Sequence, residues 1–378
     1  MTVRVMTIVG TRPEIIKLCR VMVELEKHTE HILVHTGQNY DYELNELFFN
    51  QLGVRKPDCF LEAAGINAAQ TAGNVIIKSD EALEKFRPDA ILILGDTNSA
   101  LSAYSAKRRK IPIFHMEAGN RCFDLRVPEE INRKIVDHIS DINLPYTEHA
   151  RRYLLAEGLK PDMVIKAGSP QKEVLMHYRE QIDRSDIMKQ LSLTEKMFFL
   201  VSAHREENVD NRERLGQLVD TLNKLAETYG FPVIVSTHPR TRKRLDELGA
   251  GHIDSRVQYM KAMGFFEYNH LQQKAFCVIS DSGTITEESA ILNFPAVTIR
   301  QAHERPEGMD EGIVIMCGMQ ADRLLDAVKS VTRMADEAKG ARQFRIPADY
   351  DIDNLSKKIV RIILSYIDYV NRVVWSKA

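Results

Sequence analysis

The chain has 378 residues, which is too many for one compact core and suggests two domains with a cleft between them. With 44% hydrophobic residues, 28% charged residues and a net charge of -2, its composition disfavours nucleic acid and membrane surfaces as partners. No run approaches the roughly 18 apolar residues that span a bilayer, and the first residues lack the apolar stretch of a secretory signal, so we expect a cytoplasmic protein. Its five cysteines are scattered and form no CxxC pair, which predicts neither disulfides nor a cysteine-ligated metal.

Short β-branched runs alternate with amphipathic helical patterns along the whole chain. This alternation predicts an α/β fold of two doubly wound domains, each a parallel sheet with helices on both faces. We place the domains at residues 1–170 and 171–354, and the amphipathic helix at 355–378 either finishes the second domain or packs on the first. The expected strands are VRVMTIV, HILVHT, AILILG, IPIFHM, INLPY and MVIKAG, then FFLVSA, PVIVST, FCVISD, PAVTIR and GIVIMC.

Nearly every expected strand is followed by charged or polar residues. In open α/β sheets, ligands bind beyond the carboxyl ends of the strands, where loops and helix N-termini converge. The motifs at these positions are GTRPEIIK (10–17), GDTNSA (95–100) and HMEAGNR (115–121) leading into PEEINR (128–133), then HREEN (204–208), HPR (238–240), DSGT (281–284) and RQAHERPEG (300–308).

Arg12 and Lys17 lie in the first motif, beside the start of a helix whose first turn suits Pro13. Two basic groups there favour an anionic ligand, although solvated charges at an ordinary turn would give the same pattern. No GxGxxG follows the first strand, and no Walker sequence occurs in the chain. Neither a dinucleotide site nor a P-loop is therefore predicted.

Three carboxylates, Asp96, Glu117 and Glu129, are expected close together at strand ends of the N-terminal half. Like charges gathered in a partly dry cleft raise some of their pKa values and suit them for proton transfer. Three carboxylates could also bind a metal. No DxD or HxxxE spacing occurs at these strand ends, however, so no metal site is predicted.

A helix is expected to begin at Pro128, which suits a first helical turn. In this helix Ile131, Ile135 and Ile139 are predicted to form the buried face. Glu129 and Glu130 then lie at its start, where acids complement the helix dipole, and one of the two is expected to be an ordinary surface acid.

The C-terminal half carries the residue types that bind phosphate. Backbone N–H groups of Ser282, Gly283 and Thr284 would open a helix and receive a phosphate, although Ser282 could equally be a plain N-cap. Arg305 could pair bidentately with a second phosphate, whereas alone it would be read as a surface arginine. The residues that follow the other strands of this half are candidates for contacts to leaving-group oxygens, with His238 the less certain: His204, Arg205, Asn208 and His238.

Taken together in this order, GTRPEIIK, GDTNSA, HMEAGNR with PEEINR, HREEN, SDSGTITEE and ERPEG resemble the motifs of the non-hydrolysing UDP-N-acetylglucosamine 2-epimerases over nearly the whole chain. The resemblance implies two Rossmann-like domains in a GT-B-type arrangement and a homodimer. It implies a reaction in which UDP is eliminated to give a 2-acetamidoglycal and then adds back with C2 inverted. Neither a nicotinamide nor a metal cofactor is implied.

The same resemblance implies roles for individual residues. Asp96, Glu117 and Glu129 match the acids that handle the C2 proton and the cationic character at C1. His204 matches the histidine near the diphosphate, and Arg12 and Lys17 match basic residues of the cleft. The UDP site is matched by Ser282, Gly283, Glu288 and Arg305, with Glu288 as a ribose ligand.

EAGNRCFD followed by RVPEEINRKIVDH resembles the branch that makes UDP-N-acetyl-L-fucosamine from UDP-2-acetamido-2,6-dideoxy-L-talose for capsule or O-antigen synthesis. Relatives acting on UDP-N-acetylglucosamine usually have TGQH, where this chain has Asn39 in TGQNYD, and a longer loop before PEE. The alternatives are a UDP-N-acetylglucosamine/UDP-N-acetylmannosamine 2-epimerase and a UDP-sugar glycosyltransferase, which would need an acceptor. A non-catalytic nucleotide-sugar sensor would bind UDP and leave C2 unexchanged.

Overall fold

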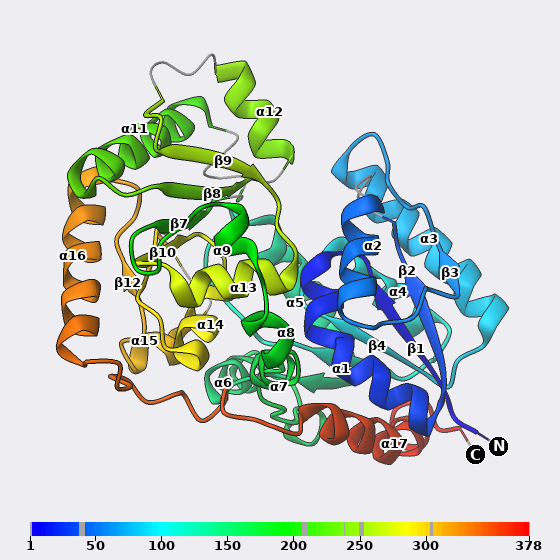
Figure 1. Ribbon diagram of the computed structural model, residues 1–378. Coiled ribbons are helices and arrows are strands. Elements are labelled where there is room, and N and C mark those ends of the chain that lie inside the picture. The colour runs from blue at the N-terminus through cyan, green and yellow to red at the C-terminus, as the bar shows by residue number, and fades with distance from the viewer. Residues whose placement is uncertain are drawn as a thin grey trace. The chain divides into compact units, whose positions relative to one another are not determined.

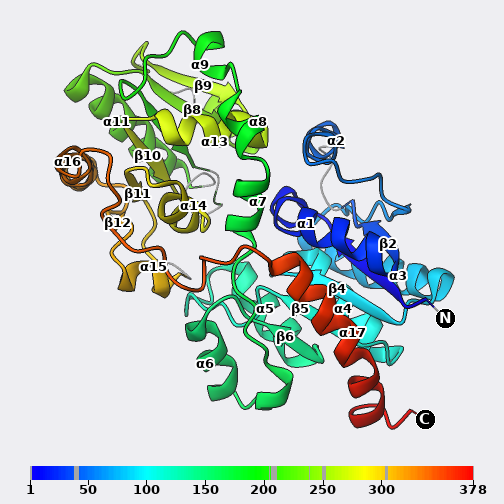
Figure 2. The ribbon, with the colours of Figure 1, turned by 60° about the horizontal axis from the view of Figure 1, so that its bottom comes forward.

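The computed structural model describes residues 2–37, 42–203, 205, 211–237, 239–248, 253–302 and 305–377. The chain divides into two compact units, which we call unit 1 (Met1–His177 with Ala348–Ala378) and unit 2 (Tyr178–Pro347). These limits lie a few residues from the boundaries expected at 170 and 354. Figures 1 and 2 show the elements of each unit from two directions. Over the described residues, no helix combines the length and apolar character needed to cross a membrane.

Unit 1 is built on a six-stranded parallel sheet with the order β3-β2-β1-β4-β5-β6. The expected strand MVIKAG forms only one isolated bridge, between Val164 and Asn143. The elements of unit 1 are β1 (Arg4–Val9), α1 (Arg12–His28), β2 (Glu30–His35), α2 (Tyr42–Gln51), β3 (Cys59–Phe60), α3 (Ala68–Phe86), β4 (Ala90–Leu94), η1 (Asn98–Leu101), α4 (Ser102–Arg108), β5 (Ile113–Met116), α5 (Pro128–Ile139), β6 (Ile142–Leu144), α6 (Glu148–Ala156), η2 (Pro161–Met163), α7 (Gln171–His177) and α17 (Leu355–Val373).

Unit 2 contains a second six-stranded parallel sheet, with the order β12-β11-β10-β7-β8-β9. Two such sheets with helices confirm the predicted α/β fold class. The elements of unit 2 are α8 (Arg179–Asp183), α9 (Ile187–Gln190), β7 (Phe199–Ser202), α11 (Arg212–Tyr229), β8 (Val233–Thr237), α12 (Pro239–Leu248), β9 (Val257–Lys261), α13 (Phe265–Lys274), β10 (Cys277–Ser280), α14 (Ile285–Leu292), β11 (Ala296–Thr298), α15 (Pro306–Asp310), β12 (Ile315–Met316) and α16 (Ala321–Glu337).

The central strands are mostly apolar because helices cover both faces of each sheet, although β5 contains the buried His115. Every residue of β4 is buried. In unit 1 one face packs on α3, α4 and α5, and in unit 2 one face packs on α11 and α16. The side chains of such strands are committed to the core, which leaves the strand ends as the places where polar residues can gather.

The last helix, α17, packs against α1 within unit 1 (Figure 2). Its buried stripe includes Ile359, Ile363 and Val370, spaced as an amphipathic helix requires. The chain leading into it is held by Asp349, whose carboxylate accepts hydrogen bonds from the Glu148 N–H and the Lys166 side chain. The C-terminal segment therefore completes the unit with which the chain begins.

Candidate active site

The carboxyl ends of β1, β4 and β5 are neighbours in the sheet of unit 1. This order brings together the loops that carry GTRPEIIK, GDTNSA and HMEAGNR. The Gly95 N–H donates to the Met116 carbonyl at 2.9 Å, and Glu117 Oε2 lies 3.9 Å from the position a Cβ on Gly95 would occupy. The loops carrying Asp96 and Glu117 are therefore in direct contact.

Glu117 is held by a cation and an amide. Lys17 Nζ lies 2.6 Å from Glu117 Oε2, and Asn120 Nδ2 donates to Glu117 Oε1 at 3.2 Å. The side chains of Lys17 and Glu117 are both largely buried, which strengthens their attraction. The ammonium also lies 5.9 Å from the ring centroid of Tyr146. Lys17 therefore fixes the carboxylate in one place.

Asp96 is held by side chains of α5. Arg133 of α5 places Nη2 2.6 Å from Asp96 Oδ2 and Nη1 2.9 Å from Glu130 Oε2. Asn132 donates to the Asp96 carbonyl at 2.9 Å. Glu129, half-buried, lies in the first turn of the same helix, so α5 joins these carboxylates into one region.

Asp96 and Glu117 are each paired with a cation, which the sequence analysis did not predict. Charges taken out of water are retained where an opposite charge and hydrogen bonds compensate them. Within the described ranges, no three His, Cys, Asp or Glu side chains come together in a way that would hold a metal ion.

The predicted buried face of α5 is also wrong. Ile131 is 51% exposed and Ile135 is 45% exposed. The buried positions of α5 are Glu130, Arg133, Val136 and Asp137. Most of them are polar, because their side chains contact the loops at the strand ends. Glu130 is not the expected surface acid.

Glu130 shapes the loop that precedes α5. It accepts hydrogen bonds from the N–H groups of Cys122 and Phe123, both at 3.2 Å. Burial raises the pKa of Glu130, but these hydrogen bonds and Arg133 outweigh burial and hold the pKa below its usual value. The ionised carboxylate therefore anchors the loop and turns Phe123 outward into solvent.

Glu14 is a buried carboxylate that the sequence analysis missed. It accepts hydrogen bonds from Gly10 N at 2.9 Å and Thr11 Oγ1 at 2.8 Å, and from the hydroxyls of Thr97 and Ser99. It thus ties the loop after β1 to the loop after β4. Two features of the sequence could have indicated this role: an acid within GTRPE, and the hydroxyl residues of GDTNSA after the other strand. Arg12 lies nearby in sequence, with its guanidinium 5.8 Å from the ring centroid of Phe48.

Gly119 is required by its surroundings. Its φ is +79°, and a Cβ there would meet the Ala150 carbonyl oxygen at 2.5 Å. We expect Gly119→Ala to lower the free energy of unfolding by about 2–4 kcal/mol, since left-handed strain and a backbone clash add. Gly53→Ala is the matched control, because Gly53 has φ +57° but nothing within 4 Å, and we expect it to cost about 1 kcal/mol. Urea unfolding of the two variants measures both effects, and equal losses would contradict the clash.

In unit 2 the loops after β7 and β10 are joined. The Arg205 N–H donates to Asp281 Oδ2 at 3.0 Å, and Arg205 Nε donates to the Asp281 carbonyl at 2.9 Å. Arg205 and Ser282, predicted separately from sequence, therefore lie at the same edge of the sheet.

The helix after this loop, α14, begins at Ile285, so Ser282 is not its N-cap. The expectation of free N–H groups also fails for two of the three residues. The Ser282 N–H donates to Ser280 Oγ at 3.0 Å, and the Thr284 N–H donates to Ser282 Oγ at 3.3 Å. The small hydroxyl side chains satisfy the backbone locally, and a bound phosphate would have to replace those bonds.

Arg305 is buried rather than on the surface. Its Nε lies 2.9 Å from Glu287 Oε1, and both side chains are almost fully excluded from solvent. Glu288, also buried, accepts a hydrogen bond from Gln272 Nε2 at 2.6 Å. The first turn of α14 thus holds Arg305, a predicted phosphate ligand, through Glu287, and it supplies Glu288, the predicted ribose ligand. His204, Asn208 and His238, and also Asn39, lie outside the described residues.

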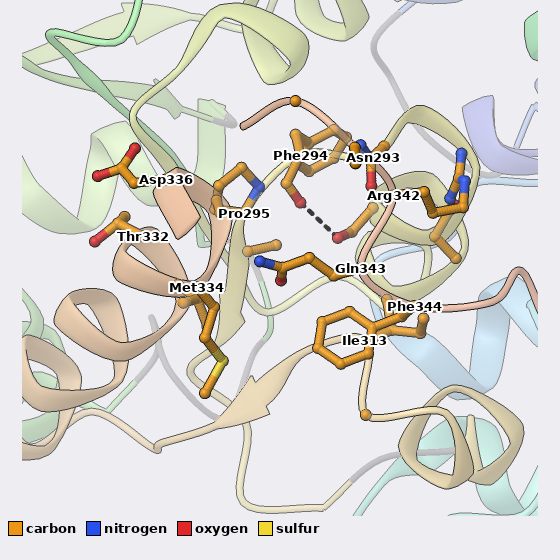
Figure 3. A pocket seen from close by; sticks show the side chains of 18 of the residues that line it. Asn293, Phe294, Pro295, Ile313, Thr332, Met334, Asp336, Arg342, Gln343 and Phe344 are labelled. Atoms are coloured by element: carbon orange, nitrogen blue, oxygen red, sulfur yellow. Dashed lines mark hydrogen bonds between the residues drawn. The ribbon is translucent and has the colours of Figure 1, made fainter. Parts of the chain in front are cut away.

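Unit 2 also contains a pocket of about 730 Å³, shown in Figure 3. Phe276 and Pro295, which directly precede β10 and β11, line it together with Phe344. Arg342, another lining residue, donates to the last carbonyls of α14. The pocket therefore lies at the amino ends of β10 and β11, whereas Ser282 follows the carboxyl end of β10. None of the predicted site residues that the structure describes lines it.

Comparison with known proteins decides the family. The family model described as UDP-N-acetylglucosamine 2-epimerase matches residues 23–364. The chain belongs to this family. The epimerase is 57% identical to a solved UDP-N-acetylglucosamine 2-epimerase from Rickettsia bellii, with a TM-score of 0.91 and coverage of 100% of both chains.

Two further relatives show the breadth of the family. The epimerase is 32% identical to the Methanocaldococcus jannaschii enzyme solved in complex with UDP-GlcNAc and UDP, with a TM-score of 0.88 and coverage of 96% and 99%. It is 32% identical to the UDP-2,3-diacetamido-2,3-dideoxy-D-glucuronate 2-epimerase of Pseudomonas aeruginosa over 86% of this chain and 92% of that protein. These matches confirm a GT-B-type fold and an isomerase of the nucleotide-sugar C2 epimerase class.

Proposed function

We propose that the epimerase inverts C2 of UDP-2-acetamido-2,6-dideoxy-L-talose to give UDP-N-acetyl-L-fucosamine in the cytoplasm, as a step toward capsule or O-antigen. The observation that carries the choice of sugar is the loop between Glu117 and Glu129. This loop presents Phe123 and Leu125, which are 73% and 66% exposed. A 6-deoxy sugar has a methyl group where N-acetylglucosamine has a hydroxymethyl group, and an apolar surface favours the methyl group.

The proposed reaction needs no redox partner. A carboxylate removes the C2 proton while the C1–O bond to UDP breaks, and the electron pair forms the C1–C2 double bond of a 2-acetamidoglycal. UDP then adds back at C1, and C2 takes a proton on the opposite face. Asp96, Glu117 and Glu129 are the groups that we propose for proton transfer. General acid–base catalysis by such groups contributes about 10²–10⁴-fold in rate.

The leaving UDP requires stabilisation of its negative charge. The groups that we propose for the diphosphate and ribose include Arg205, which donates to Asp281 next to Ser282, and Arg305, which pairs with Glu287 of α14. The full proposed set is Arg12, Lys17, His204, Arg205, Asn208, His238, Ser282, Gly283, Thr284, Glu288 and Arg305.

The alternative is a UDP-N-acetylglucosamine/UDP-N-acetylmannosamine 2-epimerase. The names of most relatives favour it, including the Rickettsia bellii protein at 57% identity. The Pseudomonas aeruginosa relative, however, is named for a sugar that differs at C3 and C6. Family membership therefore fixes the chemistry at C2 and leaves the rest of the sugar open.

Both proposals are tested in one experiment. The purified protein is incubated in deuterated water, without added cofactor or acceptor, with each UDP-sugar in turn, and proton NMR follows C2. We expect deuterium at C2 and interconversion of the talose and fucosamine derivatives at a kcat/KM at least about tenfold above that for UDP-N-acetylglucosamine. Turnover of UDP-N-acetylglucosamine alone supports the alternative, and binding without exchange contradicts both.

We also propose that the epimerase is a homodimer. Ile77 of α3, Tyr104 of α4, and Ile131 and Ile135 of α5 are all substantially exposed, and these helices cover the same face of the unit 1 sheet. An apolar surface of this kind is typical of a subunit interface. Sedimentation equilibrium should give twice the chain mass of 43.2 kDa. A concentration-independent mass of one chain would contradict the proposal.

A further inference from the structure

His115 lies in the middle of a buried charged network beneath the strand-end loops. It belongs to β5, whose register places it beside Ile93 of β4 and Asn143 of β6. His115 is 1% exposed, and Asp137, which faces it from α5, is fully buried. No role in the reaction follows from the sequence motif for either residue.

Both ring nitrogens of His115 lie close to an oxygen atom. Nε2 lies 2.8 Å from the Gly95 carbonyl oxygen, which can only accept, so Nε2 must carry a hydrogen. Nδ1 lies 3.0 Å from Asp137 Oδ1, without a well-aligned hydrogen bond. The pairing of a protonated ring with Asp137 is therefore an attraction of opposite charges over this short distance.

The carboxylate of Asp137 is itself engaged as an acceptor. It receives the Gly119 N–H at 3.2 Å and Arg121 Nη1 at 2.7 Å. Arg121 also pairs with Glu157 Oε2 at 2.7 Å, and His138 Nε2 lies 3.1 Å from the same oxygen. Arg121 and the Gly119 N–H therefore hold the Asp137 carboxylate in place.

We infer that His115 is an imidazolium and acts as a positioning residue, fixing the loops that carry Asp96 and Glu117 in one arrangement. Through Nε2 it holds the carbonyl of Gly95, the residue before Asp96. Through Nδ1 it pairs with Asp137, which holds the N–H of Gly119, two residues after Glu117. One buried cation therefore connects the ends of β4 and β5.

The balance of forces on the ring supports this inference. Burial lowers the pKa of His115, but the interactions with Asp137, the Gly95 carbonyl and the Asn143 side chain outweigh burial, so the pKa is raised. A raised pKa makes the contribution of the cation complete below the ordinary histidine value of about 6.5. It is lost only as the pH rises through the pKa of the folded state.

The protonation state is tested directly on the wild-type protein. With histidine labelled by ¹⁵N, NMR at about pH 7.5, one unit above the ordinary pKa, should show both ring nitrogens of His115 carrying protons. The spectrum of His115→Gln identifies the resonances. In Asp137→Asn, which keeps the side-chain size but removes the charge, the ring should lose one proton. A wild-type ring with a single proton at this pH overturns the inference.

The positioning role is tested by kinetics on whichever UDP-sugar the enzyme turns over, so it does not depend on the identity of the sugar. His115→Gln should lower kcat by about 10- to 100-fold with KM changed less than about threefold, since misplaced catalytic groups cost rate rather than binding. In the wild-type enzyme, kcat should fall as the pH rises through the pKa of folded His115. This fall should be absent in His115→Gln. His28→Gln, a partly exposed histidine on α1, is the control and should keep wild-type kinetics. A kcat for His115→Gln within about twofold of wild type overturns the positioning role.

Discussion

Glu117→Gln is expected to lower both kcat and the rate of deuterium uptake at C2 by about 10³-fold, because an amide cannot take the proton. The change conserves shape, so the contact with Asn120 can persist, while Lys17 loses its carboxylate partner 2.6 Å away. NMR in deuterated water measures the exchange, and calorimetry with UDP measures whether the nucleotide still binds. We expect UDP affinity to change less than about threefold, since the lost interaction acts on the sugar.

Glu148→Gln is the control for this prediction. Glu148 is an exposed carboxylate at the start of α6 in the same unit, and its loss should leave kcat unchanged. Parallel measurements on Asp96→Asn and Glu129→Gln show which carboxylate serves each face of the sugar. Exchange at C2 by Glu117→Gln at a rate close to wild type would rule out this residue as a proton-transfer group.

Arg305→Ala is expected to lower the free energy of unfolding of unit 2 by about 3–5 kcal/mol, because it leaves the buried carboxylate of Glu287 without its cation. Circular dichroism during urea unfolding measures the loss. The matched control is Arg345→Ala, which breaks the exposed pair with Glu311 in the same unit and should cost less than about 1 kcal/mol. Equal losses in the two variants would contradict the importance of burial.

A double variant, Glu287→Leu with Arg305→Met, separates stability from binding. Replacing a buried ion pair by apolar groups of similar volume is often neutral, so stability should return to within about 1 kcal/mol of wild type. If Arg305 contacts the diphosphate, UDP affinity in the double variant should still be lower by about 1.5–3 kcal/mol. A stable double variant that binds UDP as wild type does would make Arg305 purely structural.

The amino-acid sequence alone determined the sheets and the location of the polar residues. A central strand buried on both faces is mostly apolar, so a run such as AILIL predicts such a strand, and β4 is buried at every position. Most polar side chains are therefore expected at strand ends, where the motifs carrying Asp96, Glu117 and Ser282 lie. The shortest strands were less readable: MVIKAG yields one bridge, because an edge segment needs few of its residues to pair.

Only the tertiary structure decided which partner each charged group takes. The period of α5 allows more than one inward face, and the isoleucines suggested the wrong one. The helix instead turns Glu130, Arg133 and Asp137 inward, toward groups supplied by distant parts of the chain. The ion pairs of Asp96, Glu117 and Arg305 join residues far apart in sequence or on different elements. Local pattern does not encode these pairings, because a buried charge is stable only where the fold brings its counter-charge within a few ångströms.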